Sequence, residues 1–222
     1  RQSNSSVDAS LIGTVHASAG MVVDDVNVVL GRVQNDVLAQ LRVLANAMGG
    51  SLTEAVQDYF LFTVVGAVVR PDFTFVFGCG DGVAILNGLD LKLGLADGTN
   101  APPYLGYHLV GQGRDSLKVK ALIPTSELQS LVVATDGLEG FMENPSAKIP
   151  GKNQEVGFLS QFWKDDKFFA NPDALRRFLF LANKPSETFD WKAQVVRREH
   201  GLLKDDTSLV VIRDATKGPT KS

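Results

Sequence analysis

The sequence feature that most constrains the fold is a short buried strand that ends in an aspartate. Residues 130–135 read Ser-Leu-Val-Val-Ala-Thr, an apolar run rich in β-branched residues and bounded by polar ones, which is the pattern of a buried strand. Asp136 follows directly, and Gly137 lets the backbone turn away. Because an unpaired charge at the edge of a core is costly, this carboxylate needs a metal, a cation or backbone donors as its partner.

Two further acidic clusters stand beside predicted strands. Residues 73–78 alternate Phe with smaller or polar residues and lead into Gly80-Asp81-Gly82, and Asp205-Asp206 precede the apolar run 209–212. Each cluster alone is also typical of an ordinary turn or a solvated loop. Together, three acidic clusters at strand ends of one chain predict a single shared site.

The composition is that of an ordinary globular protein. With 222 residues, of which 44% are hydrophobic and 21% charged, the chain is long enough for one large core or two small ones. Since no linker-like stretch divides it, we expect one domain over residues 1–222. A net charge of -3 and a pI near 5.6 argue against nucleic acid or an anionic membrane as the main partner.

The single cysteine and the start of the chain bear on the cellular compartment. Cys79 excludes an internal disulfide and indicates a reducing compartment, so we expect a cytoplasmic protein. No apolar run is long enough to cross a bilayer. Residues 1–6 carry neither an initiator Met nor a signal-peptide pattern, so we expect a fragment or a processed product.

The apolar periodicity predicts an α+β fold. We expect a weak strand at 11–15, a helix after Asp24 and Asp25, and a second helix from the capping box at Ser51 to the residue before Pro71. Two consecutive helices differ from the strict alternation of a doubly wound sheet. The later strands are expected at residues 73–78, 83–93, 107–110, 117–123, 131–135 and 209–213.

Turn chemistry sets the sheet type. Asn87-Gly88 between apolar runs predicts a hairpin with a type I′ turn. Consecutive strands joined by short turns form antiparallel sheets, so we expect helices gathered on the sheet faces in a layered sandwich. Residues 140–161 are expected to form an exposed loop, and Asn171-Pro172-Asp173 to begin the last helix.

The acidic clusters indicate a particular chemistry. Carboxylates without a convincing set of His or Cys ligands are typical of sites for hard divalent cations, Mg²⁺ or Mn²⁺. Such ions serve phosphoryl chemistry, because they shield the charge of a phosphate and lower the pKa of a bound water.

Three motifs carry a resemblance to a known family. Gly78–Gly82, Ala134–Leu138 and Asp205–Val211 resemble, in the same order, three signatures of the PP2C family of metal-dependent serine/threonine protein phosphatases. The likeness spans the chain from about Leu11 to Arg213. It implies a four-layer α-β-β-α sandwich with two antiparallel β-sheets and a binuclear Mn²⁺ or Mg²⁺ centre in a cleft at one end of the sheets.

The resemblance also implies roles for individual residues. Asp136 and Asp205 would be the metal ligands on which catalysis depends, and Asp81 would lie near a third metal position. The resemblance places three further residues just outside the ligands: Asp206, Gly137 and His16. The implied reaction is hydrolysis of phosphoserine or phosphothreonine monoesters in a phosphoprotein by a metal-activated water.

The chain departs from the family early in its sequence. In the best register, His16 and Ala17 stand where members carry an Asp-Gly pair whose Asp bridges both metals, and Gly140 occupies a position that is often acidic. One imidazole replaces a bridging carboxylate poorly. The centre is therefore expected to bind metal weakly or not at all unless Asp24, Asp25 or Asp8 compensates. The alternative function is a catalytically inactive relative that serves as a binding or regulatory module.

The other reactive side chains are interpreted as structural. His108 lies among aromatic and aliphatic residues, as a packed and hydrogen-bonded histidine does, and His200 is expected at the end of a helix. Cys79 is expected to be a small core hydrophobe. The pairs Arg176-Arg177 and Arg197-Arg198 are expected on solvated faces.

Overall fold

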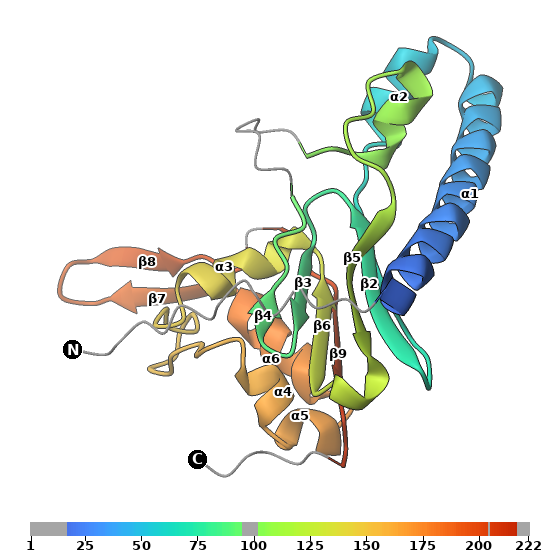
Figure 1. The fold of residues 1–222 in the computed structure, drawn as a ribbon. Coiled ribbons are helices and arrows are strands. Elements are labelled where there is room, and N and C mark those ends of the chain that lie inside the picture. Colours follow the sequence, from blue (N-terminus) through green and yellow to red (C-terminus); the bar gives the residue numbers. More distant parts are fainter. Residues whose placement is uncertain (1–16, 95–101, 204, 217–222) are drawn as a thin grey trace, which may run out of the picture.

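The computed structural model describes residues 17–94, 102–203 and 205–216. In this part of the chain, helices and antiparallel sheets occur together, which confirms the predicted α+β class (Figure 1). The strand expected at 11–15, as well as His16 and Asp8, lie outside the described residues. No helix of the described part is long and apolar enough to cross a membrane.

The first sheet has the strand order β1-β2-β5, and all its neighbours are antiparallel. The pairing of β2 with β5 shifts between Val76 and Phe77, which marks an irregularity of the bulge type. Its strands are β1 (Val64–Val69), β2 (Phe73–Cys79) and β5 (Lys118–Pro124).

The second sheet has the order β4-β3-β6-β9 and is also antiparallel. Its central strand β6 is the buried strand that the sequence predicts, and it ends one residue before Thr135. The strands are β3 (Val83–Leu86), β4 (Leu89–Asp90), β6 (Ser130–Ala134) and β9 (Leu209–Arg213).

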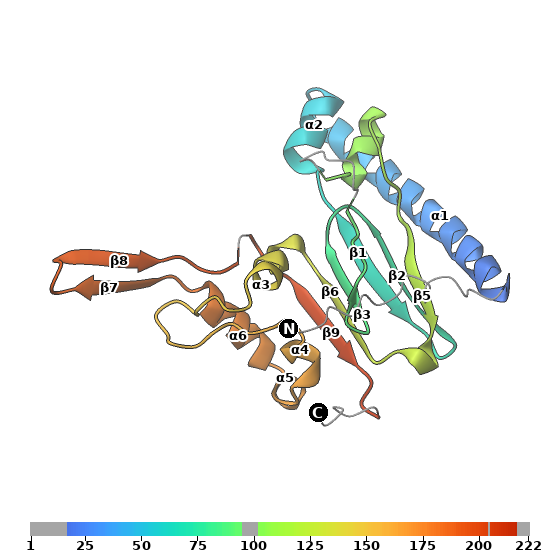
Figure 2. The same ribbon diagram turned by 60° about the vertical axis from the view of Figure 1, so that its left-hand side comes forward.

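Helices lie on the outer side of each sheet (Figures 1 and 2). The long helix α1 (Ala17–Met48) packs against the first sheet, with α2 (Leu52–Tyr59) at one end. The second sheet is covered by α3 (Glu139–Glu143), α4 (Gln161–Lys164), α5 (Lys167–Ala170) and α6 (Ala174–Asn183).

Three apolar clusters fill the spaces between these layers. Alternate residues of β3 belong to two different clusters. Ala84 and Leu86 face the first sheet, while Val83 and Ile85 face the short helices. The cluster under the helices contains edge-to-face Phe pairs, with Phe162 5.5 Å from Phe178 between ring centroids. The third cluster joins α1 to the outer face of the first sheet through Leu30, Cys79, Leu105 and Leu117.

Several local predictions are confirmed. Ser51 caps α2, because its hydroxyl accepts from the Glu54 N–H while the Glu54 carboxylate accepts from the Ser51 N–H. Asn87 and Gly88 have φ values of 51° and 84°, as a type I′ turn requires. The last helix follows Asn171-Pro172-Asp173 as expected.

Other expected elements are wrong. The first helix begins at Ala17 rather than after Asp24 and Asp25, because Ala17 and Ala19 favour the helix toward the N-terminus. The second helix ends at Tyr59, and the β-branched run 64–69 forms β1.

The region expected as a strand at 107–110 is part of the 3₁₀ helix η2 (Leu105–Val110). Leu105 and Leu109, four residues apart, are both buried there, a spacing that fits a helical turn better than a strand. Residues 140–161 are not simply an exposed loop, since they begin inside α3 and bury Ile149, Val156 and Leu159.

A third, two-stranded sheet was missed. The hairpin of β7 (Ser186–Asp190) and β8 (Val195–Glu199) extends away from the two main sheets (Figure 2). His200 therefore follows a strand and not a helix.

Candidate functional site

The register of the second sheet brings three loops to one edge. Val83 of β3 and Leu209 of β9 both pair with Ala134, the last residue of β6. Because β6 runs antiparallel to both neighbours, the chain that leaves β6 and the segments that enter β3 and β9 lie at the same end of the sheet (Figure 1).

The three predicted acids occupy these loops. Asp81 precedes β3, Asp136 follows β6 and Asp205 precedes β9. Burial raises the pKa of Asp81, and the negative charge of Asp136 raises it further against the effect of a backbone hydrogen bond. The charge of Asp136 therefore acts at Asp81, although burial has the larger effect on its pKa.

A tyrosine that the sequence did not suggest lies within electrostatic range of all three acids. Burial raises the pKa of Tyr104, and the charges of Asp81, Asp136 and Asp205 raise it as well. Its segment is attached to the first sheet, since the Cys79 thiol donates to the carbonyl of the neighbouring Pro103 at 3.3 Å. The sequence carried no signal for this placement, because it depends on tertiary contacts.

Backbone contacts join the Asp136 and Asp205 loops. The Thr135 hydroxyl donates to the Asp206 carbonyl at 3.1 Å and accepts from the Ser208 N–H at 3.0 Å. A Cβ on Gly137 would lie 2.8 Å from the Asp205 carbonyl oxygen. Glycine at 137 thus lets the two loops approach, a role in positioning rather than in chemistry.

The Asp205 side chain is oriented by its own loop. Its Oδ1 accepts from the Asp206 N–H at 2.7 Å, and its carbonyl accepts from the Thr207 hydroxyl at 3.1 Å. Asp206 is exposed and contributes main-chain contacts to the site.

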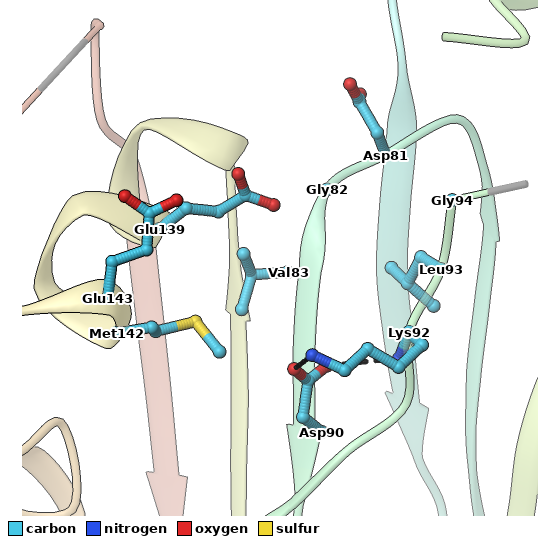
Figure 3. A pocket seen from close by; sticks show the side chains of 10 residues that line it. All are labelled: Asp81, Gly82, Val83, Asp90, Lys92, Leu93, Gly94, Glu139, Met142 and Glu143. Atoms are coloured by element: carbon cyan, nitrogen blue, oxygen red, sulfur yellow. Dashed lines mark hydrogen bonds and ion pairs between the residues drawn. The ribbon is translucent and has the colours of Figure 1, made fainter. Parts of the chain in front are cut away.

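A pocket of about 530 Å³ opens beside Asp81, between α3 and the β3–β4 hairpin (Figure 3). Figure 3 shows Glu139 and Glu143 of α3 on one side of this pocket and Asp81 on the other. Asp90 and Lys92 form an ion pair at its floor. The pocket is lined by Asp81, Gly82, Val83, Asp90, Lys92, Leu93, Gly94, Glu139, Met142 and Glu143.

The sequence analysis missed the acids of α3. Glu139 and Glu143 are four residues apart, so a helix places them on one face. This spacing could have been recognised, but residues 140–161 were interpreted as a loop. Hydrogen bonding and charge from Asp90 raise the pKa of Lys92, and the charge of Glu139 adds to the effect.

Asp136 and Asp205 are carboxylates, which is the donor type that hard cations prefer. Among residues 17–94, 102–203 and 205–216, no group of three or more His, Cys, Asp or Glu is placed to hold a metal ion. Mg²⁺ and similar ions, however, keep several waters and use only one or two protein carboxylates. Asp136 and Asp205 could supply these.

The remaining reactive side chains are buried or lie in contacts within the fold. Cys79 is 1% exposed, and burial raises the pKa of its thiol to about 11, which makes it a poor nucleophile. His108 Nε2 lies 2.6 Å from the Asp115 carbonyl oxygen. Arg176-Arg177 are exposed and lie in ion-pair range of Asp173, and Arg197-Arg198 pair along the β7–β8 hairpin.

Comparisons of the chain with protein-family models, with curated proteins and with solved structures found no match. The candidate site therefore rests on the residues and the geometry given above.

Proposed function

We propose that this chain is a PP2C-like, metal-dependent phosphatase that hydrolyses phosphoserine and phosphothreonine monoesters in proteins. The observation that supports the proposal is that the loops that carry Asp81, Asp136 and Asp205 lie at one edge of the second sheet. These acids stand in the three motifs that resemble the family signatures. The order helix, sheet, sheet, helix also agrees with the four-layer sandwich that the resemblance implies.

Carboxylates that repel each other form a site with a preference for cations. Asp136 and Asp205 are the residues we propose as ligands of Mn²⁺ or Mg²⁺, with Asp81 beside them. A bound divalent ion would neutralise the charge of a phosphate and lower the pKa of a water molecule. Burial is the main cause of the raised pKa of Asp81, and the negative charge of Asp136 adds to it.

Two observations favour a second candidate function. The described residues contain no group of three side chains placed for a metal, and His16-Ala17 replace the family's Asp-Gly pair. A PP2C-like module that binds a protein partner without catalysis would need neither.

Phosphatase assays on designed variants distinguish the two functions. We expect the wild type to hydrolyse p-nitrophenyl phosphate and a phosphothreonine peptide with Mn²⁺, and Asp136→Asn and Asp205→Asn to lose activity by about 100-fold or more. Asp58→Asn, at an exposed position of α2, is the matched control and should keep full activity. A wild type that is inactive with Mn²⁺ would contradict the first function and leave the second.

A further inference from the structure

Thr135 is the residue that joins β6 to the turn containing Asp136. It lies opposite Ser208, because the register that pairs Ala134 with Leu209 continues by one residue on each strand. The Thr135 N–H donates to the Ser208 carbonyl at 3.1 Å, as one of the two bonds of an antiparallel pair does. Backbone pairing of β6 with β9 therefore reaches the residue directly before Asp136.

The second bond of this pair is made by a side chain and not by the backbone. The Thr135 carbonyl accepts from the Leu138 N–H at 3.3 Å, which closes the 3₁₀ turn η4 (Asp136–Leu138). The Ser208 N–H donates to the Thr135 hydroxyl at 3.0 Å. The hydroxyl thus takes the place of a carbonyl in the ladder, and the main chain turns at Asp136 while its link to the other loop is kept.

The same hydroxyl reaches further into the loop that begins with Asp205. It donates to the Asp206 carbonyl at 3.1 Å, so one hydroxyl group, as donor and as acceptor, binds both ends of residues 206–208. The side chains of Asp136 and Asp205 are exposed, and packing does little to fix them. The positions of these two carboxylates therefore depend on the main chain that carries them.

We propose that Thr135 is a positioning residue, whose hydroxyl holds residues 206–208 against the turn at Asp136 and so sets the separation of the Asp136 and Asp205 carboxylates. This inference rests on the proposed function, because it assigns both carboxylates to cation binding. Thr135 itself touches neither cation nor substrate in this assignment and acts through the main chain. Replacing residues that orient metal ligands typically costs about 10–100-fold in metal affinity.

Two substitutions of Thr135 separate the hydroxyl from the size of the side chain. Thr135→Val replaces the hydroxyl with a methyl group of similar size, and Thr135→Ser keeps the hydroxyl. We expect Thr135→Val to weaken Mn²⁺ binding by about tenfold or more in a calorimetric titration, and Thr135→Ser to stay within about threefold of the wild type. Thr188→Val, at an exposed position of β7, is the matched control and should bind as the wild type does.

Amide hydrogen exchange of Ser208 gives a readout that needs no metal. Its N–H should exchange about tenfold faster in Thr135→Val than in the wild type, because it loses its acceptor, and at nearly the wild-type rate in Thr135→Ser. An unchanged exchange rate in Thr135→Val overturns the inference. Faster exchange with unchanged Mn²⁺ affinity overturns it as well, and so does a Thr135→Ser variant that binds Mn²⁺ as weakly as Thr135→Val.

Failure of the proposed function gives a different result from failure of this inference. A wild type that binds no Mn²⁺ contradicts the metal-dependent phosphatase, and the exchange rate of Ser208 then decides by itself whether the hydroxyl holds the loop. Circular dichroism and thermal unfolding check that the variants fold. If Thr135→Val does not fold, Thr135→Ala removes the same hydroxyl with a smaller side chain and is expected to show the same two changes.

Discussion

At the scale of single residues, Asp115 shows how a buried charge fixes the segment before β5. Its side chain is 1% exposed and lies 2.8 Å from the Lys118 ammonium and 2.9 Å from that of Lys120. Burial alone would raise its pKa, but hydrogen bonds from both lysines and from the Ser116 N–H lower the pKa below its ordinary value of 3.8.

The lowered pKa predicts a pH-dependent stability. A carboxyl group whose pKa is lower in the folded protein than in the unfolded protein stabilises the fold at pH values above its unfolded pKa. This stabilisation is lost as the pH falls through its folded pKa. Asp115→Asn should therefore lower the free energy of unfolding by about 1–3 kcal/mol near neutral pH. Urea unfolding of both proteins at about pH 7 and about pH 3.5 should show this difference shrinking in acid. An equal difference at both pH values would contradict the assignment.

Gly137 gives a second prediction at this scale. A methyl group there would lie 2.8 Å and 3.0 Å from the carbonyl oxygens of Asp205 and Asp206, so Gly137→Ala should destabilise the protein by about 1–3 kcal/mol. Gly31→Ala in α1 is the control, because no atom lies within 4 Å of its added methyl, and it should stabilise slightly. Denaturant unfolding measures both. Equal stability of Gly137→Ala and the wild type would show that the loops move apart easily.

At the scale of elements, the turn of the β3–β4 hairpin is hydrogen-bonded to the segment that precedes β6. The Asn87 side-chain oxygen accepts from the N–H groups of Gln129 and Ser130, at 2.7 Å and 3.1 Å, and its amide donates to the Glu127 carbonyl at 3.0 Å. One turn residue thus links the hairpin to the segment that enters β6.

Replacing this asparagine separates hydrogen bonding from backbone strain. Asn87→Gly removes the three bonds but accepts the φ of 51°, whereas Asn87→Ala also places a Cβ in the left-handed region. We expect losses of about 2 kcal/mol for Gly and about 1 kcal/mol more for Ala, by thermal or urea unfolding. Equal losses would mean that the turn changes its conformation.

Elements whose structure is specified by a few neighbouring residues could be predicted from the sequence. The capping box at Ser51, the Asn87-Gly88 turn and the β-branched run of β6 each specify a local structure that tertiary contacts did not override. The run 64–69 was assigned to a helix because a short apolar stretch has no distinctive period. The β7–β8 hairpin buries almost nothing, so it leaves no hydrophobic pattern in the sequence.

The same distinction applies to the site. The acids next to strands could be found, because a strand end fixes where its next residue lies. Tyr104 could not, since tertiary contacts of its loop bring it in, and the α3 acids were missed because the i, i+4 spacing of Glu139 and Glu143 was not recognised as helical. Whether Asp81, Asp136 and Asp205 hold metal stays a prediction.

At the scale of the whole molecule, β6 is the strand on which the proposed site depends. Both of its faces are buried, Leu131 toward the first sheet and Val132 toward the short helices. Both of its neighbours are antiparallel to it, so loops distant in sequence meet where it ends. The acidic edge is therefore a product of the complete sheet, and any function of that edge requires the folded domain.

The most direct test of this account is a calorimetric titration of the folded chain with Mn²⁺. We predict measurable binding by the wild type and by the Asp58→Asn control, and its loss in Asp136→Asn and in Asp205→Asn. A wild type that binds no Mn²⁺, or an Asp136→Asn variant that binds it as well as the wild type does, would contradict the account.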